Sequence, residues 1–127
     1  MAEDAQISEA EWQVMDVVWK KAPIGAAEVI AELEAATGWR PTTVKTLLAR
    51  LVKKKFLNYK KDGNRFLYRP KTKREDCLRQ ASTTFVERFF GGEPLPMVLH
   101  FVEQGKLAKS DIQELRRMLD EAEARND

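Results

Sequence analysis

The stretch WRPTTVKTLLARLVKK, residues 39–54, decides the fold of this 127-residue chain. Pro41 suits the first position of a helix, because the N–H that proline lacks has no helical partner there. Four apolar residues then recur at helical spacing and predict a stripe that faces a core: Val44, Leu47, Leu48 and Leu51. The opposite face is predicted to present small hydroxyls, one methyl group and cations, without any acid: Thr42, Thr46, Ala49 and Lys53, flanked by Lys45 and Arg50.

This outward face has two interpretations. Lysine and arginine can simply keep a surface soluble, although a solvated helix face usually mixes both charge signs. Small side chains and cations can instead approach the base edges and phosphates of DNA. The net charge of +2 hides three blocks: residues 1–39 carry −6, residues 40–74 carry +12 and residues 75–127 carry −4. The middle block, with 13 Lys/Arg against one acid, is typical of a polyanion-binding segment and favours the second interpretation.

Two helices are predicted before this stretch. Ser8 and Glu11 form a capping box that begins the first helix, and Pro23 ends it by about residue 21. The larger side chains on one face of that helix are assigned to the core: Trp12, Met15 and Trp19. The second helix begins near Ala26 and stops at Gly38, since glycine readily adopts a left-handed backbone. Two helices, a tight glycine-containing turn and a basic face predict a helix-turn-helix.

A hairpin is predicted after the basic helix. Beyond Phe56 the hydrophobic period changes to two, which indicates strands over residues 57–60 and 66–70. Gly63 and Asn64 tolerate positive φ, so residues 60–65 predict a turn tipped with cations, the wing of a winged helix-turn-helix. The predicted base readers are Thr42, Lys45, Thr46 and Arg50. The predicted phosphate contacts are Arg40, Thr43, Lys53 and Lys54, together with the wing residues Lys60, Lys61, Asn64 and Arg65.

Three further amphipathic helices are predicted in the C-terminal part. Thr72 and Ser110 each open a capping-box pattern, and Pro94 or Pro96 suits a first helical turn. Three helices in about 55 residues make a poor independent core at this size, so we expect pairing with a second copy. The predicted dimer interface consists of Leu78, Phe85, Phe89, Leu95, Val98, Leu99, Val102, Leu115 and Leu119.

Several classes of site are excluded or left open. Cys77 is the only cysteine, so an intrachain disulfide or an all-cysteine metal site is excluded, and a reducing cytoplasm fits. Nearby cations could make Cys77 a redox sensor, with an ordinary helical position as the alternative. His100, the sole histidine, lacks partners for a metal or catalytic role. The sequence contains no catalytic constellation, so we expect neither enzyme activity nor a cofactor. It shows no signal peptide, and its longest apolar run, residues 96–102, is too short to span a membrane, so we expect no membrane insertion.

The chain resembles the BlaI/MecI/CopY family of bacterial repressors over nearly its full length. The similarity rests on SEAEWQVMDVVW (residues 8–19), WRPTTVKTLLARLVKKK (residues 39–55), YRP (residues 68–70) and FFGG (residues 89–92). The resemblance implies a dimeric winged-helix repressor that occupies an operator over a promoter, often beside genes for a membrane sensor or transporter. In the antibiotic-resistance members it implies release by proteolytic cutting at an Asn–Phe bond, which aligns with His100–Phe101 here.

The chain departs from the family pattern at three places. Histidine replaces asparagine at the aligned cleavage bond, and Arg40 replaces the usual Ser or Thr before Pro41. The copper-responsive members carry a C-terminal cysteine cluster, whereas this chain ends EAEARND, so copper sensing by that route is excluded. The operator, the regulated genes and the inducing signal do not follow from the residues.

The sequence therefore predicts a mainly α chain with a small β-hairpin. Residues 1–71 would form a winged helix-turn-helix DNA-binding domain and residues 72–127 a three-helix dimerisation domain. The predicted function is a cytoplasmic homodimeric repressor of a palindromic double-stranded DNA operator, with a membrane sensor or protease system as a further partner. The alternative is a winged-helix module whose basic face docks an acidic protein, but such surfaces favour exposed aromatics and deplete lysine. Single-stranded RNA readers usually stack bases on sheet aromatics, and Tyr59, Phe66 and Tyr68 are instead assigned to packing the wing.

Overall fold

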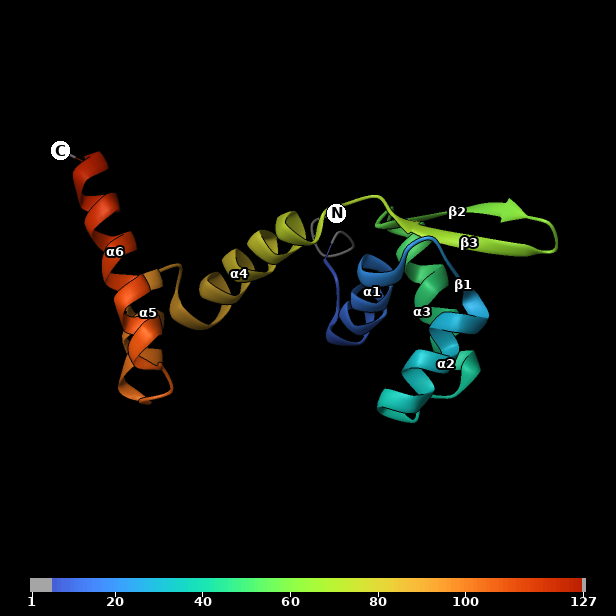
Figure 1. The fold of residues 1–127 in the computed structure, drawn as a ribbon, viewed down its shortest axis with the longest axis horizontal. Coiled ribbons are helices and arrows are strands. Elements are labelled where there is room, and N and C mark those ends of the chain that lie inside the picture. The colour runs from blue at the N-terminus through green and yellow to red at the C-terminus, as the bar shows by residue number, and fades with distance from the viewer. Residues whose placement is uncertain (1–5, 127) are drawn as a thin grey trace. The chain divides into compact units, whose positions relative to one another are not determined.

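The computed structural model describes residues 6–126, in which the chain forms six helices and a three-stranded antiparallel sheet (Figure 1). The chain divides into two compact units, Met1–Ser82 and Thr83–Asp127. The elements are α1 (Glu9–Lys21), β1 (Ile24–Gly25), α2 (Ala26–Thr37), α3 (Pro41–Lys53), β2 (Leu57–Asp62), β3 (Arg65–Pro70), α4 (Arg74–Phe90), α5 (Pro94–Glu103) and α6 (Lys109–Asn126). The predicted fold class, mainly helical with a winged helix-turn-helix, is confirmed. The predicted functional boundary after residue 71 stays a prediction.

The first unit contains the hydrophobic core. Figure 1 shows α1, α2 and α3 gathered on one side of the sheet, and their apolar faces meet there. Val44 and Leu51 of α3 are fully buried, as their helical spacing predicts. Trp12 and Trp19 are partly buried and pack edge-to-face against each other, with ring centroids 5.3 Å apart, which confirms their assignment to the core. The remaining core residues are Val14, Met15, Val18, Ile24, Val29, Leu33, Leu47, Leu48, Phe56, Leu57 and Cys77.

Local sequence signals set the ends of the first three helices. Ser8 and Glu11 form the predicted capping box, in which the Ser8 hydroxyl accepts from the Glu11 N–H at 3.2 Å and the Glu11 carboxylate accepts from the Ser8 N–H at 2.9 Å. Gly38 ends α2 with φ of 76°, where a side chain would be strained. Pro41 opens α3, and Arg40 before it supplies no side-chain cap. These signals place α3 where its sequence predicts.

The sheet differs from the predicted hairpin in two ways. Its strand order is β1-β3-β2, because the two residues of β1 pair with Tyr68 and Leu67 of β3. This short strand was not predicted. Strands β2 and β3 also extend to Asp62 and Arg65, so Lys61, Asp62 and Arg65 lie in strands rather than in the turn. Only Gly63 of the two turn residues has positive φ, at 65°.

Two of the predicted helix starts in the C-terminal part are wrong. Helix α4 begins at Arg74, and the Lys73 carbonyl, not that of Thr72, accepts the first helical bonds. Helix α6 begins at Lys109, two residues before the start that a Ser110 cap would give. The Asp111 carboxylate instead accepts from the Ala108 N–H at 2.9 Å. Helix α4 is thus one residue shorter at its start than a Thr72 cap predicts, and α6 is two residues longer than a Ser110 cap predicts. The predicted proline start of α5 is confirmed, with Pro94 in its first turn.

Candidate nucleic-acid interface

The outward face of α3 is solvent-exposed along its length. The burial pattern leaves the side chains of Thr42, Thr43, Lys45, Thr46, Ala49, Arg50 and Lys53 exposed, while the apolar stripe on the other side is buried. The Thr46 hydroxyl donates to the Thr42 carbonyl at 2.9 Å. Thr46 therefore presents a methyl group and free lone pairs to any partner, which suits contact with a thymine methyl or acceptance from an amino group of a base.

The cations on this face have no acidic partner in the part of the chain that the structure describes. Among residues 6–126, neither Lys45 nor Arg50 nor Lys53 forms an ion pair. Arg40 lies at the N-terminal end of α3, where the helix dipole favours an anion. The helix thus offers an electrostatically uncompensated surface to a polyanion, as the sequence predicts.

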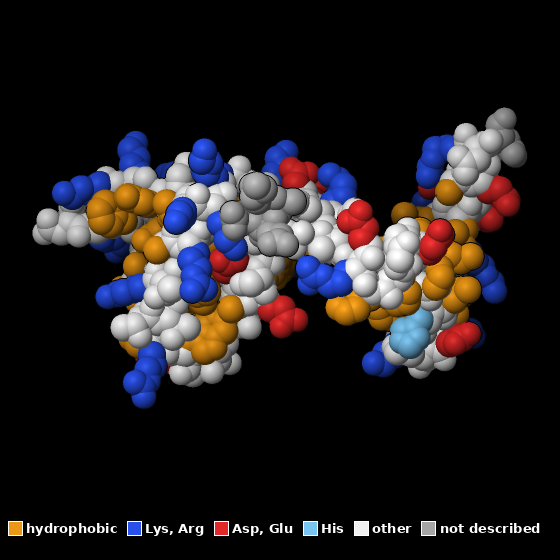
Figure 2. Space-filling model, turned by 180° about the vertical axis from the view of Figure 1, so that it is seen from behind, with side chains coloured by type: hydrophobic (Ala, Val, Ile, Leu, Met, Phe, Trp, Pro, Cys, Tyr) orange, Lys and Arg blue, Asp and Glu red, His pale blue; other side chains and the backbone are white. Residues whose placement is uncertain are grey.

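The wing carries further cations on the hairpin after α3. Lys60, Lys61 and Asn64 are exposed, but Arg65 donates from Nη2 to Glu28 Oε1 at 2.6 Å. The backbone of Gly25 makes room for this pair, since a Cβ at that residue would lie 3.2 Å from both atoms. Arg65 therefore has an acidic competitor for any phosphate. Figure 2 shows Lys and Arg side chains spread over the wing and the adjoining surface.

Aromatic side chains line one face of the wing. Tyr59 and Phe66 contact each other edge-to-face, with centroids 4.7 Å apart, and Tyr68 lies 5.8 Å from Tyr59. Tyr68 packs against the core, whereas Tyr59 and Phe66 remain about half exposed. Their mutual contact fits the prediction that these rings pack the wing, but the exposure of two of them was not anticipated.

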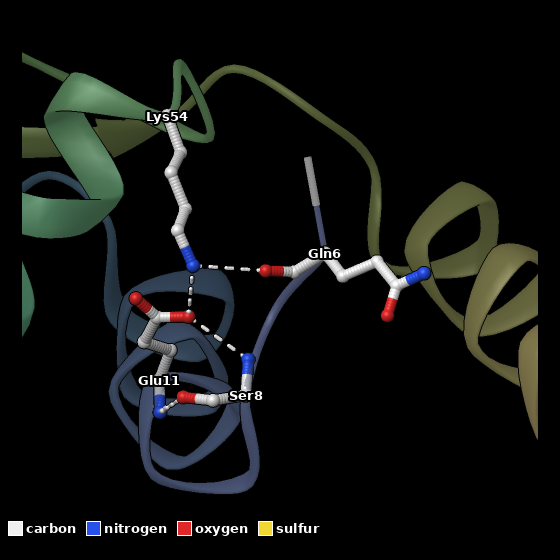
Figure 3. A network of polar contacts seen from close by, with 4 residues as sticks. All are labelled: Gln6, Ser8, Glu11 and Lys54. Atoms are coloured by element: carbon white, nitrogen blue, oxygen red, sulfur yellow. Dashed lines mark hydrogen bonds and ion pairs between the residues drawn. The ribbon is translucent and has the colours of Figure 1, made fainter. Parts of the chain in front are cut away.

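One of the predicted phosphate contacts is engaged inside the protein. The Lys54 ammonium donates to Glu11 Oε1 at 2.8 Å and to the Gln6 carbonyl at 2.9 Å (Figure 3). Its side chain is 23% exposed, and that of Glu11 is 2% exposed. The sequence showed a lysine in a basic run and could not show a carboxylate 43 residues away. The geometry gives no support to a phosphate role for Lys54.

The second unit exposes a large apolar surface. All of the predicted interface residues except Leu78 lie in this unit. Leu115 is half-buried and the other eight, Leu78 included, are exposed, with Phe89 at 65% and Leu95 at 61%. Helices α5 and α6 contain no buried residue. Figure 2 shows hydrophobic side chains gathered on the surface of this unit, a pattern that marks interaction sites in soluble proteins. His100 and Phe101, the aligned cleavage bond, lie within α5, and the His100 ring contacts the Gln104 amide at 2.8 Å.

The remaining reactive residues show no sign of a chemical site. Cys77 is buried, and burial together with the adjacent Asp76 carboxylate raises the pKa of its thiol. A raised pKa disfavours the reactive thiolate, so the ordinary core position fits Cys77 better than a redox sensor. Residues 6–126 bring together no group of three His, Cys, Asp or Glu side chains suited to a metal ion. No helix in that range has the length and apolar character needed to cross a membrane.

Sequence comparisons connect this geometry to characterised repressors. The sequence model of the penicillinase repressor family matches residues 7–121. The chain is 42% identical over 116 residues to a penicillinase repressor of Bacillus licheniformis, covering 91% of each chain. It is also 37% identical over 114 residues to the methicillin resistance regulatory protein MecI of Staphylococcus aureus, covering 90% of this chain and 93% of that one.

Structural comparisons agree for the first unit. The solution structure of the DNA-binding domain of the repressor BlaI matches with a TM-score of 0.53 and 46% identity, over 57% of this chain and 88% of that one. Monomeric Bacillus licheniformis BlaI in complex with the blaP half-operator matches with a TM-score of 0.51 and 46% identity, over 56% of this chain and 87% of that one. This family is one of transcriptional repressors and not of enzymes, as the sequence predicts. The chain belongs to the penicillinase repressor family, also called the BlaI/MecI family.

Proposed function

We propose that this protein is a sequence-specific repressor that binds a palindromic double-stranded DNA operator as a homodimer in the cytoplasm. The observation that carries the proposal is the outward face of α3, which is exposed and free of acidic side chains, and whose Lys45, Arg50 and Lys53 form no ion pair with any other described residue. The complex of BlaI with a half-operator supports DNA as the partner, because that domain shares 46% identity with this one.

Two kinds of contact are proposed within this interface. Side chains near the middle of α3 would enter the major groove and read base edges: Thr42, Lys45, Thr46 and Arg50. Cations and hydroxyls at the ends of α3 and along the wing would hold phosphates and orient the domain: Arg40, Thr43, Lys53, Lys60, Lys61 and Asn64. Arg65 would join the second group only by leaving Glu28. Both groups belong to the first unit, which is large enough to bind one half-site.

The homodimer is proposed from the apolar surface of α4, α5 and α6. A side chain such as Phe89 loses favourable burial when it faces water, and a second copy would cover it. A symmetric dimer also presents two copies of α3 to two half-sites, so a palindromic operator follows from the symmetry of the protein. The same symmetry would raise affinity for the full operator, because the second half-site is bound at a high effective concentration.

Release from DNA is proposed to follow a signal, through cutting at His100–Phe101 by a protease linked to a membrane sensor. This step rests on the family alignment. The bond lies within α5, between the apolar residues Leu99 and Val102, so cutting would divide the proposed dimer surface. Because helical backbone does not fit a protease cleft in its folded form, α5 would have to open first.

The experiment that tests the function is selection from a random duplex pool with the full-length protein, followed by titration of the selected duplex at increasing salt. We expect an inverted repeat, bound at least about 10³-fold more tightly than a scrambled duplex. An RNA duplex and a single strand of the same sequence serve as controls for polyanion binding. Equal affinity for all sequences would contradict sequence-specific repression, and failure to bind any duplex would favour an acidic protein partner for the basic face.

A further inference from the structure

A three-residue corner joins the two elements that are proposed to touch DNA. Helix α3 ends at Lys53, Lys54 is its C-terminal cap, and β2 begins at Leu57. Lys55 between them adopts φ of 71°, the only positive φ at a residue other than glycine in the described range. The Phe56 N–H then donates to the Leu51 carbonyl at 2.9 Å. The corner thus turns the chain sharply and sets the angle between the recognition helix and the wing.

Lys54 ties this corner to α1. Its ammonium donates to Glu11 Oε1 at 2.8 Å and to the Gln6 carbonyl at 2.9 Å, and the same Glu11 oxygen accepts from the Ser8 N–H at 2.9 Å (Figure 3). Among the described residues, no buried side-chain nitrogen or oxygen lacks a partner. The network therefore satisfies the buried carboxylate and joins segments 43 residues apart in the sequence. Because its only acid is one of the most buried residues of the chain, water screens this pair little.

Lys54 is poorly placed to neutralise a phosphate. Two of the three ammonium protons are already donated inside the protein, and the Glu11 charge cancels that of Lys54 at 2.8 Å. Lys53, its neighbour in sequence, is exposed and has no ion pair among residues 6–126. Adjacent lysines in one basic run therefore have different environments, and the structure provides a matched pair for comparison.

We propose that Lys54 is a positioning residue for operator binding, which acts through Glu11 and the backbone of Gln6 to hold the corner between α3 and the wing. This inference rests on the proposed DNA-binding function and changes the role of one of its residues. Lys54 contributes to affinity by fixing two contact elements in one geometry, and it releases no counterion from DNA. Glu11, an acid far from α3 in the sequence, becomes part of the machinery for DNA recognition.

The test measures the affinity of the full-length protein for its selected operator across a salt series, for the unaltered chain and three variants. Lys53→Met is the control and should reduce the slope of log affinity against log salt by about 0.9 per protomer. Lys54→Met should weaken binding about 2- to 30-fold without changing that slope, the range seen for residues that act on a site through the scaffold. Circular dichroism confirms that each variant is folded at the titration temperature.

The double variant Glu11→Gln/Lys54→Met separates positioning from charge. Glutamine can still accept from the Ser8 N–H, and no unpaired carboxylate remains buried, so this variant should fold even where Lys54→Met does not. Removing one charge of each sign leaves the net charge unchanged. Because the tie from residue 54 to Glu11 and Gln6 is still missing, we expect this variant to bind about 2- to 30-fold more weakly than the unaltered chain, with an unchanged slope. Full recovery of affinity would overturn the inference and assign the loss in Lys54→Met to the unpaired buried carboxylate.

The possible outcomes distinguish failure of this inference from failure of the proposed DNA-binding function. A slope reduced by about 0.9 per protomer in the double variant, as in Lys53→Met, overturns the inference and makes Lys54 a phosphate contact. Affinities of Lys54→Met equal to the unaltered protein also overturn it, because the corner then needs no such anchor. An unaltered chain that binds no duplex selectively overturns the proposed function, and this inference with it.

Discussion

Replacing Phe89 with alanine should weaken the dimer strongly. Phe89 is 65% exposed, so roughly 130 Å² of its surface is available to a partner if a phenylalanine buries about 200 Å² in all. At about 25 cal/mol per Å², covering that area contributes up to about 3 kcal/mol for each ring. A symmetric dimer contains the residue twice, although single truncations at interfaces rarely cost more than about 4 kcal/mol. We expect a dissociation constant about tenfold to a thousandfold higher.

Sedimentation equilibrium over a range of protein concentrations measures this change directly. Glu87→Ala is the matched control, because Glu87 is an exposed polar residue of the same helix and loses no apolar area. Binding to a single half-site should be unchanged in Phe89→Ala, since α3 and the wing lie in the first unit. A dimer as tight as that of the unaltered chain would refute the reasoning and move the interface away from the C-terminal end of α4.

Further predictions concern DNA affinity and stability. Arg50→Ala should cost about 1 to 3 kcal/mol on the selected operator and less on scrambled duplex, measured by competition titration; an equal loss on both would make Arg50 a phosphate contact. Glu28→Gln should free Arg65 and steepen the salt slope of operator binding by about 0.9 per protomer, whereas weaker binding at an unchanged slope would mean that Glu28 orients Arg65. Burial acts to raise the pKa of Glu11, but the hydrogen bonds and charge of Lys54 and the hydrogen bonds of Ser8 together lower it below its ordinary 4.5. Its contribution to stability is therefore complete above that value and is lost as the pH falls through the lowered pKa, so urea unfolding of the unaltered chain and of Glu11→Gln should converge in acid.

The sequence predicts correctly those helix ends that depend on only a few neighbouring residues. The Ser8 capping box, the glycine at residue 38 and the proline at residue 41 each act within one helical turn, and the structure places α1, α2 and α3 accordingly. The apolar stripe of α3 likewise predicted its buried face. These features can be predicted from the sequence because the hydrogen bonds within a helical turn involve residues no more than four apart.

Features that depend on distant residues were missed. Strand β1 is two residues long, and its pairing with β3 follows from the packing of α1 and α2, which no local periodicity records. The predicted caps at Thr72 and Ser110 are wrong for a different reason, because nearby groups take their place. The Lys73 carbonyl accepts the first helical bonds of α4, and the Asp111 carboxylate accepts from the Ala108 N–H at the start of α6. The ion pair between Lys54 and Glu11 could not be predicted either, because the local pattern assigns Glu11 only to the capping box of α1.

Ion pairs within the folded chain reduce the number of cations in residues 40–74 that are free to bind DNA. Three of the 13 cations in residues 40–74 form ion pairs with acids of residues 1–39. These pairs are Lys54 with Glu11, Arg65 with Glu28, and Arg74 with Asp16. Of the eight cations predicted to contact DNA, six therefore form no ion pair within residues 6–126, and about 0.9 counterions per contact give a salt slope near −5 per protomer instead of about −7. A slope near the larger value would mean that DNA displaces both internal carboxylates, so a single titration reports which ion pairs survive in the complex.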